Sequence, residues 1–263
     1  MTPPPTRRLA GLYAHPDDDA FGIGGTCAIH ADDLTLLVVY ATSGDAGRIA
    51  DASLATRETL GAVREREAAA AYGALGVDAG LRFLRYADGH VGEVPHEELV
   101  ERFAAALVAF RPDVVVTFGP DGVTGHADHV EVGRAATHAF HRSRADLGDE
   151  GPRRLLHVAI PQAELDGLGE ELRRRGIEPP DPNEPFQPRG VPDASIGVRV
   201  DCSAVYKRKL DALREHRTQA QDLEEFPQDL WPEILSHESF AMAWPEREAG
   251  EVLSDVFEGL GPA

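Results

Sequence analysis

Four ionisable side chains occur within five residues near the start of the chain, in the segment HPDDD from His15 to Asp19. Three adjacent carboxylates repel one another unless a cation or hydrogen-bond donors hold them. An imidazole together with a carboxylate is a good ligand pair for zinc or another divalent metal. The alternative interpretation is a solvated loop whose aspartates cap the helix that follows.

A second polar cluster, GHADH from Gly125 to His129, follows the turn-rich segment GPDG. Its two histidines, His126 and His129, are three residues apart at the start of an expected helix, so they point to roughly the same side. Asp128, between them, could orient one imidazole through its second nitrogen. Alternatively, the cluster is a polar helix N-terminus that contains two histidines by coincidence.

Each cluster directly follows an expected strand. Leu9–Ala14 is a short apolar strand, and Asp113–Phe118 (DVVVTF) is the clearest strand in the chain. In a parallel sheet the carboxyl ends of the strands lie on the same edge, where ligands bind. The two clusters can therefore surround one site, which makes coincidence a weaker explanation for both together than for either alone.

The remaining pattern alternates strands and helices, which predicts an α/β, Rossmann-like fold: a mostly parallel sheet with helices on both faces, in one domain over residues 1–263. A proline-rich segment, Gly176–Pro192, is expected to form a surface loop or flap. Further strands are expected at Leu34–Ala41, Leu81–Arg85, Leu155–Ile160, Ile196–Val200 and near Ser239–Ala243. Helices are expected at Phe21–His30, Arg57–Leu75, Glu97–Phe110, Ala127–Arg142, Glu164–Arg175 and Ala204–Gln221.

Composition excludes several classes of protein. The formal charge of −19 disfavours nucleic acid as a partner, since an acidic surface repels phosphate backbones. Cys27 and Cys202 carry no CxxC spacing, which excludes a disulfide scaffold and a thiolate-rich zinc site. No apolar run is long enough to span a membrane, and the first eight residues lack the features of a signal peptide. We therefore expect a cytoplasmic protein; the sequence leaves its oligomeric state open.

The glycine-rich segment Gly22–Gly25 does not have the spacing of a dinucleotide-binding loop, and the carboxylates before it would repel a pyrophosphate. A zinc deaminase is excluded because its paired cysteine ligands are missing.

The two clusters, HPDD from His15 and GHADH from Gly125, together resemble the PIG-L/LmbE-type zinc-dependent N-deacetylases. That family includes N-acetylglucosaminyl-phosphatidylinositol de-N-acetylase and the deacetylases and amidases of mycothiol and bacillithiol metabolism. Weaker similarities follow in the family's order along nearly the whole chain. They are the strand and loop Leu36–Ala46, Arg64 and Glu67 before LGV, Asp88-Gly89, and the stretch from Lys209 to Gln219 with His216.

The resemblance implies that His15, Asp18 and His129 bind Zn²⁺, with Fe²⁺ or another divalent metal as an alternative. Three protein ligands leave a fourth position for water, whose pKa zinc can lower to about 7. The resemblance also makes Asp17 the general base. It implies that a protonated His126 stabilises the oxyanion, with Asp128 orienting His126. If His126 were a ligand as well, the site would be closed and more structural in character.

The implied activity is removal of an acetyl group from a small N-acetylated amino-sugar conjugate by attack of zinc-bound water. The alternatives are an amidase acting on a larger thiol–sugar conjugate and a catalytically silent metal- or sugar-binding protein. Arg64 and Asp88 are candidates for binding substrate hydroxyls, because a guanidinium paired with a carboxylate suits a vicinal diol. An Arg64–Glu67 ion pair and an ordinary turn aspartate are the alternatives. His216 is a further candidate for substrate binding, or a structural histidine.

Three positions depart from the family pattern. Asp19 stands where glutamate is usual, and we expect this to shift only a contact behind the ligands. Thr124 replaces a tyrosine present in some members, and Arg48 occupies an acidic position of some relatives, so neither supports a specific substrate.

Overall fold

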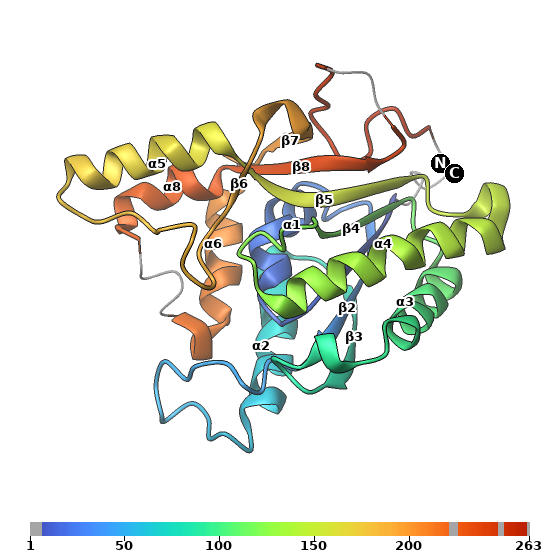
Figure 1. Cartoon of the computed structure of the whole chain (residues 1–263), viewed down its shortest axis with the longest axis horizontal. Helices are drawn as coiled ribbons and strands as arrows, with labels where there is room; N and C mark the ends of the chain where they lie inside the picture. Colours follow the sequence, from blue (N-terminus) through green and yellow to red (C-terminus); the bar gives the residue numbers. More distant parts are fainter. Residues whose placement is uncertain (1–6, 221–225, 247–249, 262–263) are drawn as a thin grey trace.

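The structure, a computed structural model, describes residues 7–220, 226–246 and 250–261. One sheet holds its strands in the order β3-β2-β1-β4-β5-β8-β7, and β6 pairs with β5 (Figure 1). The strands are β1 (Arg7–Tyr13), β2 (Leu34–Thr42), β3 (Ala79–Tyr86), β4 (Val114–Phe118), β5 (Arg154–Pro161), β6 (Gly190–Val191), β7 (Ile196–Asp201) and β8 (His237–Trp244).

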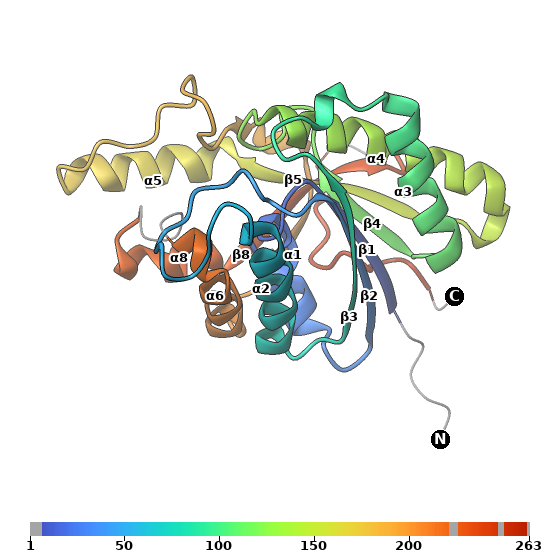
Figure 2. The same cartoon turned by 90° about the horizontal axis from the view of Figure 1, so that it is seen from below.

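Helices cover both faces of this sheet. Helices α1, α2 and α6 lie on one face, and α3 and α4 lie on the other (Figure 2). The helices are α1 (Asp18–Ile29), α2 (Leu60–Leu75), α3 (His96–Phe110), α4 (Ala127–Leu147), α5 (Gln162–Arg174), α6 (Tyr206–Glu215) and α8 (Trp231–Leu235). Short 3-10 helices occur at Val91–Glu93, Gly148–Glu150, Asp193–Ser195, Arg217–Gln219 and Gln228–Leu230. Within the described ranges, no helix is both long and apolar enough to cross a bilayer.

The expected α/β fold with a mostly parallel sheet is confirmed, with one addition. Strands β1 to β5 pair in parallel, but β8 runs antiparallel to both β5 and β7. The sheet is therefore mixed at the β7 edge.

The expected helix Ala204–Gln221 is too long in the part of the chain that the structure describes. Helix α6 ends at Glu215, because His216 adopts φ −77° and ψ 58°, and a 3-10 turn follows at Arg217–Gln219. Gln221 itself lies outside the described residues. The break turns the end of this segment toward α2, where the Glu67 carboxylate accepts hydrogen bonds from the Thr218 backbone and hydroxyl.

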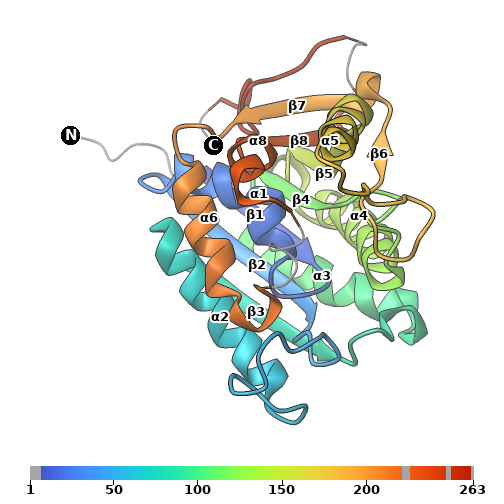
Figure 3. The ribbon, with the colours of Figure 1, turned by 90° about the vertical axis from the view of Figure 1, so that its left-hand side faces the viewer.

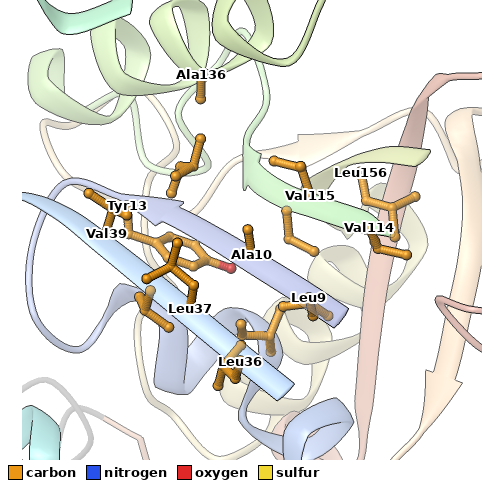
Figure 4. Close-up of a cluster of buried hydrophobic side chains, with 14 of the residues drawn as sticks. Leu9, Ala10, Tyr13, Leu36, Leu37, Val39, Val114, Val115, Ala136 and Leu156 are labelled. Carbon is orange, nitrogen blue, oxygen red and sulfur yellow. The ribbon is translucent and has the colours of Figure 1, made fainter. Parts of the chain in front are cut away.

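The central strands are buried because their apolar runs face helices on both sides. Leu9, Leu36 and Val115 are at most 2% exposed and belong to one cluster that spans β1, β2 and β4 (Figure 4). Gly11 is needed in β1, since a Cβ there would lie 2.7 Å from Cε2 of Tyr13. This tight packing fixes the direction in which each strand delivers the loop that follows it.

One buried ion pair, between Lys209 and Glu238, joins the C-terminal part of the chain to the first helix. The Glu238 carboxylate of β8 accepts hydrogen bonds from the backbone N–H groups of Gly25 and Thr26 in α1, and from Lys209 Nζ at 2.8 Å. Both charged side chains are almost completely buried. Figure 3 shows α6, which carries Lys209, running beside α1 and α2. The pair therefore holds α1, α6 and β8 in one arrangement.

Replacing Lys209 by methionine should lower the free energy of unfolding by about 3 kcal/mol, because the Glu238 carboxylate would stay buried without its cationic partner. Lys207→Met on the exposed side of the same helix is the matched control, and it should change that free energy by less than about 0.5 kcal/mol. Urea denaturation measures both. Equal midpoints for the two variants would contradict this role of the pair.

Candidate active site

The two polar clusters meet at the edge of the sheet. Strands β1 and β4 are parallel neighbours, and each ends at this edge. His15 and Asp17 follow β1, and Asp18 is the first residue of α1. His126 precedes α4, and His129 lies in its first turn. The expectation that both clusters lie on one edge is confirmed by this strand pairing.

Potential ligand atoms of three side chains, His15, Asp18 and His129, lie close together. His15 Nδ1 lies 3.1 Å from His129 Nε2, and an Asp18 carboxylate oxygen lies 3.2 Å from His129 Nε2. The other Asp18 oxygen is 3.6 Å from His15 Nδ1 and accepts a hydrogen bond from the His15 backbone. Zinc bonds of about 2.0–2.1 Å put neighbouring tetrahedral ligands about 3.4 Å apart. This donor set therefore fits a divalent metal.

His129 is held in the tautomer that a ligand needs. Its Nδ1–H donates to the Gly122 carbonyl oxygen at 3.0 Å, which leaves the lone pair on Nε2, the atom that faces His15 and Asp18. The ring also stacks on Phe118 with a centroid separation of 4.1 Å. Orientation of this imidazole therefore does not depend on a bound metal.

Negative charge surrounds His15. Besides Asp18, the carboxylates of Asp88 and Asp128 lie 3.0 Å and 3.4 Å from its Nε2. Burial lowers the pKa of His15, but the carboxylates of Asp128, Asp18 and Asp88 outweigh burial and raise it well above its usual value. Burial raises the pKa of Asp88, but His15 opposes it and brings that pKa to about 2. The centre is therefore built to hold positive charge, as a metal site requires.

Backbone amides keep two of these carboxylates in place. The Asp88 carboxylate accepts a hydrogen bond from Ala46 N at 2.8 Å. The Asp128 carboxylate accepts from Gly89 N at 2.7 Å and from Val91 N at 3.0 Å. The side chain of Asp128 is completely buried, and these two amide donors compensate for the water that it lost.

Asp17 is held by Arg64 next to the ligand cluster. Arg64 is 4% exposed, and its Nη2 donates to the Pro16 carbonyl at 2.7 Å and to the Asp17 carboxylate at 3.0 Å. Its Nη1 donates to the Gly44 carbonyl. Asp17 has φ 122°, a strained value for a residue with a side chain, which costs about 1–3 kcal/mol. Arg64 therefore fixes both the strained loop and the direction of the Asp17 carboxylate.

His126 is positioned by the backbone of Asp128. The Asp128 backbone N–H donates to His126 Nδ1 at 3.1 Å, so the ring proton is assigned to Nε2. Burial and the nearby His15 and His129 lower the pKa of His126 to about 4. Asp128 also orients His126 through its backbone amide, since its carboxylate faces His15.

The three expected substrate-binding residues lie close to the centre, but two already bind protein groups. Arg64 contacts Asp17, and Asp88 contacts His15 and Ala46. The alternative, an Arg64–Glu67 ion pair, does not account for Glu67, because its carboxylate accepts hydrogen bonds from Thr218. His216 is 3% exposed, and both its ring nitrogens lack a hydrogen-bond partner among the described residues. Burial lowers the pKa of His216 to about 3, with a further contribution from Arg64.

Sequence reasoning missed three residues that contact His126 or His129. Gly122 and Phe118 orient His129, and the Phe186 ring lies 4.9 Å from that of His126. The GPDG turn in the sequence is a signal that could have identified Gly122. Phe186 lies in the proline-rich segment, which has no motif that points to a catalytic residue.

Asp19 does not join the ligand cluster. It is buried behind it, where its carboxylate accepts a hydrogen bond from the Tyr72 hydroxyl, and burial raises its pKa to about 6.

Comparison with known proteins agrees with this geometry. The family model described as PIG-L, GlcNAc-PI de-N-acetylase, matches residues 11–140. A protein of Saccharomonospora viridis named 1D-myo-inositol 2-acetamido-2-deoxy-alpha-D-glucopyranoside deacetylase is 34% identical over 95% of this chain and 99% of its own length. The chain belongs to the PIG-L family. The resemblance of its two clusters to that family is thereby confirmed.

Solved structures extend the comparison to the fold. N,N'-diacetylchitobiose deacetylase from Pyrococcus horikoshii has a TM-score of 0.59 at 22% identity, covering 90% of this chain and 83% of its own. The hydratase GalB from Pseudomonas putida has a TM-score of 0.61 at 18% identity, covering 92% and 98%. Since a hydratase and a deacetylase share this fold, the reaction must be argued from the PIG-L site itself.

His129→Ala should abolish binding of a divalent metal, because it removes a donor that is oriented before any metal binds. His138→Ala, at an exposed position of the same helix, is the control and should retain about one zinc ion per chain after loading. Elemental analysis of chelator-free protein measures both. Zinc at wild-type level in His129→Ala would show that the ligand set is wrong.

His126→Ala separates the two roles open to His126. Its nitrogens lie within 4.8 Å of those of His15 and His129, so distance alone permits a fourth ligand. We expect zinc content to be retained, because the open site needs only three protein ligands. Loss of zinc would make His126 a ligand and the site a closed one.

Proposed function

We propose that this chain is a metal-dependent N-deacetylase that hydrolyses the acetamide of an amino-sugar conjugate. The observation that carries the proposal is the division of the site: His15, Asp18 and His129 converge, while Asp17 is held beside them by Arg64. The substrate class is supported by the names of the relatives, which describe deacetylation of an acetamido sugar joined to inositol.

In this proposal His15, Asp18 and His129 hold the metal. Zinc suits two imidazoles and one carboxylate, and Fe²⁺ or another divalent ion is compatible with the same donors. When bound, such a metal acts as a Lewis acid that polarises a carbonyl and lowers the pKa of water. The carboxylates of Asp88 and Asp128 keep the His15 ring oriented from its far side.

Asp17 serves as the general base. It takes a proton from the attacking water and later delivers that proton to the leaving amine. In the overall reaction the amide C–N bond breaks and a C–O bond forms to the water oxygen, giving acetate and a free amine. Arg64 fixes the direction of the Asp17 carboxylate, which is needed before proton transfer can begin.

His126 stabilises the carbonyl oxygen as negative charge develops on it. Its Nδ1 is occupied by the Asp128 amide, so Nε2–H is the group that can donate to this oxygen. A neutral imidazole is sufficient for this role. One such donor typically contributes about 3 kcal/mol to the transition state.

The nearest competing activity is amide hydrolysis of a larger thiol–sugar conjugate, which would use the same groups and a different pocket. A catalytically silent binding protein is a third candidate. Against it stands the strained backbone of Asp17, which nothing in a pure binding role requires.

Asp17→Asn should lower kcat by about 10²–10⁴ while zinc content stays unchanged, because only proton transfer is removed. Asp45→Asn in the exposed loop after β2 is the control. The assay follows free amine released from N-acetylglucosaminyl-inositol and from N-acetylglucosamine. Normal turnover by Asp17→Asn would reject the mechanism, and loss of zinc would make Asp17 a ligand.

Arg64→Met should lower kcat by about 100-fold and change KM little, since it misplaces the base rather than removing a contact to substrate. Arg64→Lys should recover part of kcat by restoring the positive charge beside Asp17. Arg66→Met, on the same helix and outside this contact, is the matched control. A large rise in KM with kcat preserved would instead support the hydroxyl-binding role expected from the sequence.

A further inference from the structure

Phe186 is an apolar ring left in solvent beside a catalytic histidine. Its exposed fraction is 62%, and its ring centroid lies 4.9 Å from that of His126, with an interplanar angle of 42°. Most large apolar side chains of the described residues are buried. A single exposed apolar side chain is ordinary, but one in contact with a catalytic group is a candidate ligand contact.

The backbone holds this ring in place at a conformational cost. Phe186 has φ 63°, in the left-handed region that bulky residues rarely adopt. Three residues later, the Arg189 backbone N–H donates to the Val123 carbonyl at 2.7 Å. The Arg189 guanidinium packs against Gly125, where any Cβ would clash with it. The loop between α5 and β6, visible in Figure 1, is thus docked onto the segment just before His126.

The position of Phe186 relative to the reacting amide rests on the proposed function. In that function the carbonyl oxygen faces His126 and the leaving nitrogen faces Asp17. Asp17 is bound to Arg64 of α2, whereas Phe186 contacts His126 at the start of α4. Its contact with His126 therefore places the ring beside the carbonyl group of the substrate.

We propose that Phe186 is an acyl-chain contact, and that the site hydrolyses N-acyl amino sugars whose acyl group is longer and more apolar than acetyl. An acetyl methyl is too small to cover an exposed phenyl ring, whereas a butyryl or phenylacetyl group can bury it. Each methylene removed from water is worth about a fourfold gain in binding. Water is the only co-reactant, and the products are the same free amine and the longer carboxylate.

The first experiment compares N-acetyl-, N-propionyl- and N-butyrylglucosamine with zinc-loaded enzyme by following the free amine. Wild type should give a kcat/KM for N-butyryl at least equal to that for N-acetyl. Phe186→Ala should lower the butyryl-to-acetyl ratio by about 15-fold, as expected when two methylenes lose their contact. Phe186→Leu should keep most of the ratio. Ile177→Ala, which removes another exposed apolar side chain from the same segment, should keep all of it.

Two results would overturn the proposal. One is release of acetate by wild type without release of butyrate. The other is a Phe186→Ala effect confined to the ratio between inositol conjugate and free N-acetylglucosamine, which would place the ring on the amine side.

A binding measurement keeps this inference separate from the proposed function. Calorimetry with acetate and butyrate on zinc-loaded protein should show tighter binding of butyrate to wild type, and this preference should be lost in Phe186→Ala. If no acetate is released from any acetamido sugar, the proposed function fails while this measurement still decides the role of Phe186. Equal affinity of wild type for acetate and butyrate would reject that role.

Discussion

The parallel pairing of β1 with β4 is the constraint on which the rest of the site depends. From β1 the chain builds the sheet outward through β2 and β3, and from β4 it builds in the other direction through β5. The segments after β1 and β4 lead into α1 and α4 on opposite faces of the sheet (Figure 2), as at other switch points of α/β sheets. The polar side chains of two short segments more than a hundred residues apart therefore meet, with no long loop required to bring them together.

The density of negative charge at this edge of the sheet sets the next constraint. Asp18, Asp88 and Asp128 are all largely buried around His15, and burying uncompensated carboxylates would be strongly destabilising. The chain offsets this cost with backbone donors, from Ala46 to Asp88 and from Gly89 and Val91 to Asp128. These amides come from the loop after β2 and the turn after β3. Both loops therefore hold the carboxylates of the centre in place.

Sequence reasoning succeeded where a local pattern carries the physics. Continuous apolar runs identify the buried strands, and the two polar clusters after Leu9–Ala14 and Asp113–Phe118 identify the edge where they meet. It failed where a residue's partner is set by the tertiary fold. Nothing in the helix around Arg64 indicates that its guanidinium reaches back to Asp17, 47 residues earlier. The antiparallel β8 and the break at His216 depend likewise on packing, against β5 and β7 and against α2.

The segment from Lys209 to Gln219 supports the site from behind. Lys209 fixes α6 to α1 through Glu238, and the turn after His216 binds Glu67 of α2, one helical turn from Arg64. Gln219 reaches further and donates to the Arg48 carbonyl in the loop that also provides Gly44 and Ala46. Displacement of this segment would move Arg64 and that loop together, and with them the direction of Asp17. In contrast, the loop that carries Phe186 contacts the opposite, α4 side of the centre. In the proposed function, selectivity for the acyl group can therefore vary there without disturbing the contact between Arg64 and Asp17.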